Sequence, residues 1–113
     1  MSNPCFALIA RPDAAGVAVI AVRGTVTAAA EAAALQAWQA AEAAGARAVI
    51  LDFSALEYMN SGGIGVLVLL LARARQPGRR LWTAGLSAHY REILALTRLD
   101  EVLPAWEPAA APA

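Results

Sequence analysis

The sequence has very few of the residues that build disulfides and metal sites. Cys5 is the only cysteine and His89 the only histidine among 113 residues. A single cysteine excludes a disulfide within the chain, and one cysteine with one histidine falls short of the four ligands of a structural zinc site. We therefore expect no cofactor and no metal, and we interpret Cys5 as a strand residue.

Lysine is absent, and the charges of the two signs balance. All 9 basic residues are arginines, and 9 acidic residues bring the net charge to +0. A balanced chain gives no electrostatic reason to expect nucleic acid as a partner. Arg73, Arg75, Arg79 and Arg80 gather near one predicted helix end, which is more typical of a solvated helix terminus than of a nucleic-acid contact.

No hydrophobic run is long enough to cross a membrane. The longest, residues 64–72, is interrupted by Gly65, whereas a bilayer span needs roughly 20 apolar residues. Residues 1–4 carry no basic side chain before an apolar stretch, so no signal peptide is predicted. We expect a cytoplasmic protein without membrane insertion. Its length suits a single domain, assigned to residues 1–107 with a frayed tail at 108–113.

Strand-like and helix-like segments alternate along the chain. Apolar segments bounded by turn residues predict strands at 5–10, 17–22, 47–53 and 80–84, with a weak edge segment at 102–106. The first two are spaced for a hairpin, and residues 54–60 are expected to form a loop. Helices are predicted after the potential N-caps Thr27, Ser61 and Ser87, and Gly45 ends the first. Because helical crossovers imply parallel pairing, the fold class is an α/β sandwich with a mixed four- to five-stranded sheet and three or more helices.

The most informative stretch is the junction between the third strand and the second helix. Gly62, Gly63 and Gly65 stand at the helix start, although glycine costs about 0.8–1.0 kcal/mol relative to alanine in a helix interior. Glycines let another backbone approach closely. That neighbour is either the sheet of this chain or a partner protein, and the sequence leaves both hypotheses open.

Ser61 has two interpretations. It is either a simple N-cap or a phosphorylation site, since a helix N-terminus favours anionic groups. Catalysis would need a nucleophile, a base and an orienting group, for which Ser61, His89 and Asp52 are the candidates. The G-x-S-x-G pattern is absent because Met59 stands at its first position, and the phosphate-binding G-x-x-x-x-G-K-[ST] spacing is absent too. We predict a non-enzymatic protein.

The second helix is predicted to leave apolar side chains exposed. One face, assigned to the sheet, carries Ile64, Leu67, Leu71 and Ala74. The outward positions are then Gly62, Val66, Leu69 and Arg73. We expect Val66 and Leu69 to be at least partly exposed. Exposed apolar patches tend to mark partner surfaces, unless another part of the chain covers them.

Three segments together resemble the STAS domain of bacterial anti-sigma factor antagonists. They are LDFSALEYMNSGGIGVL (residues 51–67), Gly-Thr-Val-Thr (residues 24–27) and residues 85–99. The family typically has Asp-Ser-Ser-Gly at the helix start and an aspartate in the earlier element. Here Asn60 replaces that first aspartate, Gly62 replaces the second serine, and Thr27 replaces the earlier aspartate.

The resemblance implies a bacterial signal-transduction protein that regulates transcription by partner switching. Its partner would be an anti-sigma factor that is also a serine protein kinase, and Ser61 matches the phosphoacceptor. The implied partner-binding residues are Thr25, Thr27, Asn60, Ser61, Gly62, Gly63, Val66 and Leu69. Two alternatives stay open: a non-phosphorylated STAS subunit of an ABC-type lipid-transport complex, and a nucleotide-binding sensor. The oligomeric state is not predicted.

Overall fold

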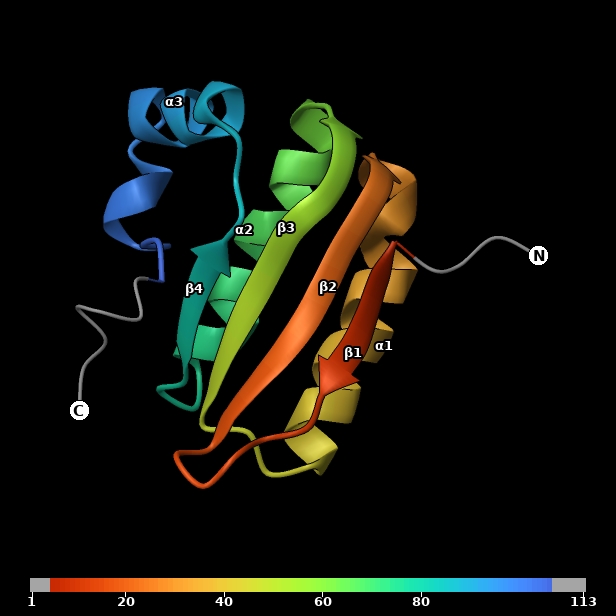
Figure 1. Ribbon diagram of the computed structural model, residues 1–113, viewed down its shortest axis with the longest axis vertical. Coiled ribbons are helices and arrows are strands. Elements are labelled where there is room, and N and C mark those ends of the chain that lie inside the picture. Colours follow the sequence, from red (N-terminus) through yellow and green to blue (C-terminus); the bar gives the residue numbers. More distant parts are fainter. Residues whose placement is uncertain (1–4, 107–113) are drawn as a thin grey trace.

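A four-stranded sheet organises the computed structural model, which describes residues 5–106. Its strands lie side by side in chain order (Figure 1). They are β1 (Phe6–Ala10), β2 (Val17–Val26), β3 (Ala48–Met59) and β4 (Arg80–Ala84). β1 pairs with β2 in antiparallel fashion, whereas β2 with β3 and β3 with β4 pair in parallel. The predicted hairpin and the predicted mixed sheet are confirmed.

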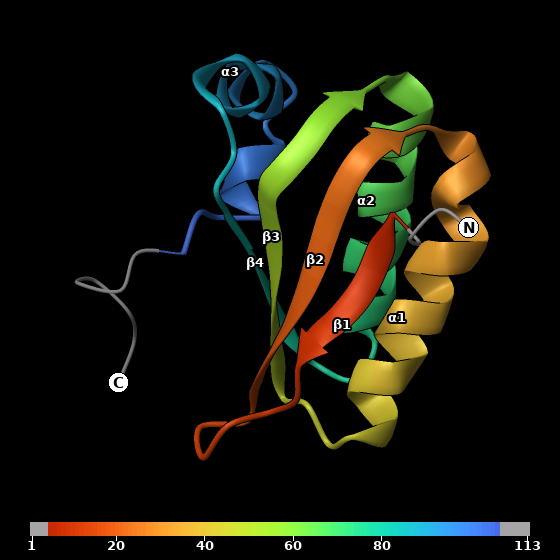
Figure 2. The same ribbon diagram turned by 45° about the vertical axis from the view of Figure 1, so that its right-hand side comes forward.

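Two helices cover one face of this sheet. α1 (Glu31–Ala43) connects β2 to β3, and α2 (Ser61–Arg75) connects β3 to β4. Both crossovers advance across the sheet in the same direction, so the right-handed preference of such connections places both helices on the same face (Figure 2). α3 (Ala88–Leu96) follows β4 beyond its carboxyl end and leads into a short 3-10 helix, η2 (Leu99–Glu101).

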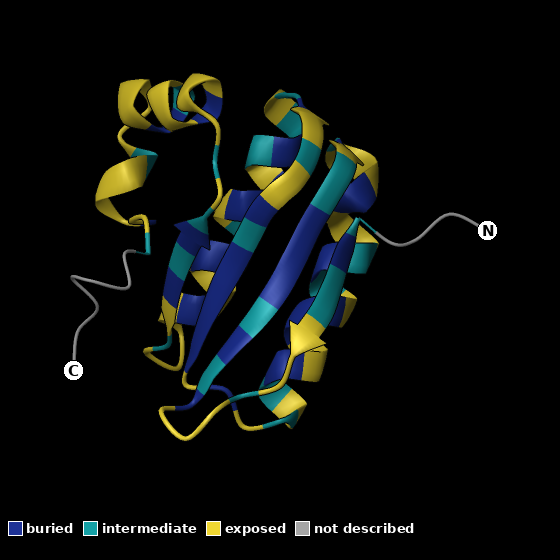
Figure 3. Cartoon of the chain, in the orientation of Figure 1, coloured by how far each residue is buried: buried dark blue, intermediate teal, exposed yellow. Residues whose placement is uncertain are grey.

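The core lies between the sheet and the two covering helices. Alternate residues of β2 and β3 point toward the helices, because side chains on a strand alternate between its faces. These residues are Ala18, Ile20, Val22, Val49, Leu51 and Phe53, all nearly inaccessible (Figure 3). From α1, the large side chain of Trp38 enters the core among buried alanines. The small alanines allow this helix to lie close to the sheet.

β3 is longer than predicted, and the loop expected at residues 54–60 is wrong. A β-bulge divides the strand: Ala21 of β2 faces Asp52, but Arg23 faces Ala55. At the bulge, Asp52 Oδ1 accepts hydrogen bonds from the backbone N–H of Ser54 at 3.0 Å and from its hydroxyl at 2.5 Å. Such an Asx turn resembles a loop in sequence, yet the strand resumes after it and continues to Met59.

The remaining elements agree with the sequence with small differences. Thr27 is an N-cap as predicted, but the first turn after it is a 3-10 helix, η1 (Ala28–Ala30), which precedes α1. The predicted edge segment is reduced to a single parallel bridge between Thr83 and Ala105. The tail assigned to 108–113 lies outside the described residues.

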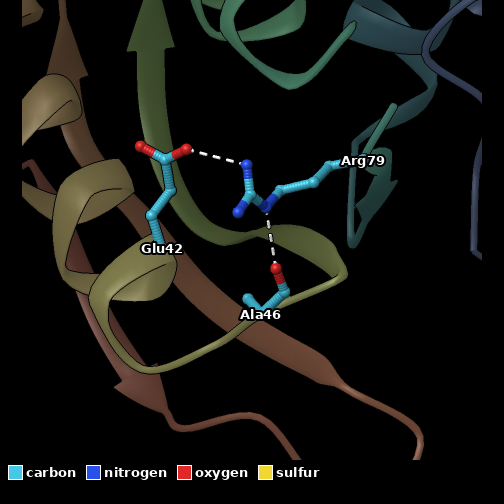
Figure 4. A network of polar contacts seen from close by, with 3 residues as sticks. All are labelled: Glu42, Ala46 and Arg79. Atoms are coloured by element: carbon cyan, nitrogen blue, oxygen red, sulfur yellow. Dashed lines mark hydrogen bonds and ion pairs between the residues drawn. The ribbon is translucent and has the colours of Figure 1, made fainter. Parts of the chain in front are cut away.

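Arg79, just before β4, bonds to the C-terminal end of α1 and to the loop that follows it. Its Nη1 donates to Glu42 Oε2 at 2.8 Å, near the end of α1, and its Nε donates to the Ala46 carbonyl at 2.8 Å (Figure 4). The guanidinium presents donors in a fixed fork, so one side chain bonds the helix and the loop after it together. Both side chains of the ion pair are partly exposed. The arginine predicted to be a solvated helix-end charge therefore has a structural role.

Replacing Arg79 with alanine should lower the free energy of unfolding by about 1–2 kcal/mol, since hydrogen bonds from charged donors contribute roughly 1.5–3 kcal/mol and partial exposure reduces this. Glu42→Gln should cost less than about 1 kcal/mol, because the bond to Ala46 remains. Urea unfolding measures both, with Arg11→Ala, an exposed arginine, as the control. Equal stability of Arg79→Ala and Arg11→Ala would contradict the structural role.

Candidate functional site

The junction between β3 and α2 is capped by Asn60, and the prediction that Ser61 is the N-cap is wrong. Asn60 has extended backbone angles, and its Oδ1 accepts from the Gly63 N–H at 3.0 Å. Asparagine is among the best capping residues, and here it stands at the position from which its side chain reaches that N–H. Ser61 is the first residue of the helix, and it is exposed. Its hydroxyl is therefore not used for capping.

Two other elements hold this junction in place. The backbone N–H of Met59 donates to the Tyr90 hydroxyl of α3 at 2.8 Å, in a buried position. The N–H of Asn60 donates to the Val26 carbonyl at the end of β2 at 3.3 Å. The two residues before Ser61 are therefore hydrogen-bonded to α3 and to β2, and these bonds fix the start of α2.

The three glycines at the start of α2 have different surroundings. A Cβ on Gly62 would come within 2.8 Å of the Ala28 backbone nitrogen. A Cβ on Gly63 would collide with the Val26 carbonyl oxygen and lie 2.6 Å from Met59 Cγ. These two glycines allow the helix to pack closely against its own chain. No atom of residues 5–106 lies within 4 Å of a Cβ on Gly65, so packing within this part of the chain gives no reason for that glycine.

The buried stripe of α2 differs from the predicted one. Val66, expected to be exposed, is only 4% exposed, so that expectation is wrong. Leu69 is partly exposed, as predicted. The buried positions recur at helical spacing and are Gly63, Val66, Leu67, Leu70, Leu71 and Ala74. The stripe is wide because α1 and η1 pack against α2 as well as the sheet.

The outward face of α2 is uncharged over three turns. Its exposed positions are Ser61, Gly65, Val68 and Ala72, and Val68 is 44% exposed. We name Ser61, Gly65 and Val68 the Ser61 surface.

Tyr58, 54% exposed, is the second-last residue of β3 and pairs with the exposed Thr25 of β2. The exposure of Tyr58 on a strand was not predicted, because its segment was expected to be a loop. Thr25 and Tyr58 alternate with the buried Val26 and Met59, which face α2, and therefore point to the opposite face of the sheet.

Other predicted site residues have local structural contacts. Thr27 is half-buried, and its Oγ1 accepts from the Ala29 N–H at 3.2 Å. Gly63 is buried and Gly62 is partly buried, so the backbone of Gly63 lies below the surface. The Cys5 thiol donates to the Thr25 carbonyl at 3.3 Å, which ties the residue before β1 to the end of β2.

The structure does not assemble the catalytic trio that the sequence suggested as a candidate. The Asp52 carboxylate bonds to Ser54, and the His89 ring packs edge-on against Tyr90 with centroids 4.9 Å apart. No hydrogen bond joins Ser61, His89 and Asp52 within residues 5–106. In the same range, no three His, Cys, Asp or Glu side chains gather as metal ligands. No helix of this part of the chain is long and apolar enough to span a bilayer.

Comparisons with known proteins agree on the fold. A family model described as "Mlab, STAS domain" matches residues 9–104. An anti-sigma factor antagonist from Mycobacterium paratuberculosis is 27% identical, with a TM-score of 0.68, over 94% of this chain and 90% of that one. The phosphorylated form of the Bacillus cell fate determinant SpoIIAA is 16% identical, with a TM-score of 0.64, over 92% and 91% of the two chains. The unphosphorylated form of SpoIIAA is 17% identical, with a TM-score of 0.60, over 80% of each chain.

Alanine substitutions at two glycines of α2 should have opposite effects on stability. Gly63→Ala should destabilise the protein by about 1–3 kcal/mol, because the added methyl group meets the Val26 backbone and the Met59 side chain. Gly65→Ala should stabilise it by about 0.5–1 kcal/mol, because alanine is the better helix former and the position is open. Thermal and urea unfolding of the matched pair test this. Destabilisation by Gly65→Ala would mean that its surroundings are not open.

Proposed function

The chain belongs to the STAS domain family, and we propose that it is an anti-sigma factor antagonist that works by partner switching. In this proposal the Ser61 surface binds an anti-sigma factor that is also a serine kinase, and phosphorylation of Ser61 ends the binding. The observation that carries the proposal is the exposed Ser61 at the first position of α2, with a hydroxyl free of the capping role. The chain itself catalyses no reaction.

The mycobacterial relative supports the antagonist role, because its similarity extends over nearly the whole of both chains. The uncharged outward face of α2 supports protein binding. Burial of apolar surface drives association, and the centre of an interface is depleted in charge. Gly65 adds to this support, since a glycine without a neighbour among the described residues permits close approach by another backbone.

A phosphate on Ser61 is compatible with the folded domain. At the start of α2, the N–H of Asn60 donates to Val26 and that of Gly63 to the Asn60 side chain. The N–H groups of Ser61 and Gly62 have no partner within the described residues. These N–H groups can donate hydrogen bonds to solvent or to the phosphate oxygens. A negative charge at this position also gains typically 0.3–1 kcal/mol from the helix dipole.

The same phosphate is incompatible with an apolar partner surface. Phosphoserine carries about −1.5 to −2 charges at pH 7, and burying them without cationic partners is costly. Val68 and Gly65 present no such partner on the outward face of α2. Phosphorylation therefore weakens partner binding while it leaves the fold intact, which is the requirement for a reversible switch.

Ser61 should be the residue that the partner kinase modifies. The purified chain is mixed with its candidate anti-sigma factor kinase and ATP, and the modified residues are mapped by mass spectrometry. We expect phosphate on Ser61 in the wild type and none in Ser61→Ala. Ser61→Asp should lower the affinity for the partner by at least about tenfold, with an unchanged melting temperature, since the charge is buried only in the complex. Phosphate at another residue, or equal affinity of all three proteins, would contradict the proposal.

Val68 should contribute to the same interface. Val68→Glu places a carboxylate on the outward face of α2 and should weaken partner binding by at least about tenfold, because an unpaired charge is desolvated in the complex. Leu96→Glu is the matched control, since Leu96 is 77% exposed and lies on α3. Both variants should fold, which circular dichroism checks. If both weaken binding equally, the interface is not centred on the Ser61 surface.

A second candidate function is a constitutive STAS subunit, for example in a lipid-transport complex, that binds its ATPase partner without phosphorylation. The cap by Asn60 favours it, because an amide at this position caps the helix without adding a carboxylate beside Ser61. The kinase experiment separates the two candidates. Tight partner binding with no phosphate on Ser61 would support the constitutive subunit.

A further inference from the structure

The outer edge of β4 has a free backbone position. The N–H of Arg80 donates to the Arg47 carbonyl on the β3 side at 3.3 Å. Backbone groups alternate between the two edges of a strand, so those of Leu81 and Thr83 point away from β3. Thr83 takes its partners from the segment after η2, but within residues 5–106 no such bond is formed at Leu81.

The chain already forms strand-like pairing on this edge at Thr83, two residues after Leu81. The Thr83 N–H donates to the Pro104 carbonyl at 2.9 Å, and the Thr83 carbonyl accepts from the Trp106 N–H at 2.6 Å. Ala105, between them, bridges to Thr83 in parallel orientation. The edge of β4 is therefore able to accept an extended segment, and residues 102–106 form no backbone hydrogen bond to its first part, at Leu81.

A groove of about 370 Å³ lies along this part of the edge. That volume is at the lower end of the roughly 300–1,000 Å³ of ligand pockets. Its walls come from α2, from β4 and from the segment after η2. The apolar lining residues are Leu71, Leu81, Trp82, Val102 and Pro104.

Among residues 5–106, the charged side chains that line the groove are all basic. They are Arg75, Arg79 and Arg80. Arg79 is paired with Glu42, whereas Arg75 and Arg80 are exposed and form no ion pair within the described residues. The groove thus combines outward backbone groups, apolar walls and two available cations, although the net charge of the chain is +0.

We propose that this groove binds an extended acidic segment of a partner protein, which adds to the sheet as a further strand beside β4. The N–H and carbonyl of Leu81 bond to the backbone of the segment. Successive side chains of a strand point to opposite faces. A carboxylate on one residue therefore meets Arg75 on the helix side, and a carboxylate on the next meets Arg80 on the other face of the sheet.

This groove is separate from the Ser61 surface. Ser61 and Arg75 are the first and last residues of α2, which has 15 residues. At 1.5 Å per residue they are about 21 Å apart along the helix axis. The two surfaces can therefore be occupied at once, and the groove does not depend on the proposed function of Ser61.

The test uses a fluorescein-labelled nonapeptide of three Val-Glu-Asp repeats, whose binding to the full chain is followed by fluorescence anisotropy. Methylation of its backbone nitrogens should weaken binding by about tenfold or more, since it removes the donors that strand addition needs. Arg75→Glu and Arg80→Glu should each weaken it by about tenfold or more, because each removes a charge-assisted bond and introduces repulsion. Arg11→Glu makes the same change in net charge away from the groove, and it should alter affinity less than about twofold.

Ser61→Asp should leave peptide binding unchanged, so this test and the kinase test fail independently. Equal affinity for the methylated and unmethylated peptides would overturn strand addition. So would the absence of any anisotropy change at protein concentrations up to about 1 mM, where even weak binding registers. Displacement of the peptide by inorganic phosphate at equal concentration would identify a small-anion site instead and would also overturn the proposal.

Discussion

The close contact between the first turn of α2 and the end of β2 determines where the rest of the site lies. Gly63 packs against the Val26 carbonyl so closely that a methyl group would not fit, and Gly62 approaches the Ala28 backbone. This contact joins the β3–α2 crossover to the start of the α1 layer. The Asn60 cap and the bond from Met59 to the Tyr90 hydroxyl then hold the helix start from the opposite side. Ser61, immediately after this cap, is exposed.

The same arrangement divides the roles of neighbouring residues. Asn60 satisfies the helix N-terminus, so Ser61 is left without a structural task. Close helix packing uses two of the three glycines, and Gly65 remains open on the outward face. At the C-terminal end of α2 the exposed side chains change from uncharged to basic, and the groove beside β4 begins there. One helix thus connects two surfaces of different character while its inner stripe holds the core together.

Much of the site was predictable from sequence, and the errors have specific causes. A capped helix start follows from Asn-Ser-Gly-Gly, but which of two adjacent polar residues makes the cap depends on backbone angles. The inward face of α2 was placed wrongly at Val66. Residues 66–71 are apolar at every position, so their pattern does not show which side of the helix faces the sheet. The exposure of Tyr58 on a strand was not predicted, because an Asx turn at Asp52 and Ser54 interrupts β3 without ending it.

The sequence by itself determined the order of strands and helices, their parallel connections and the position of the helix that begins at Ser61. These features depend on local propensity, capping and alternation, which act over a few residues. Only the tertiary structure decided the phase of α2, the continuation of β3 through its bulge and the pairing of Arg79 with Glu42. Each of these is a contact between segments far apart in the chain, and its free energy depends on neighbours that no local pattern encodes.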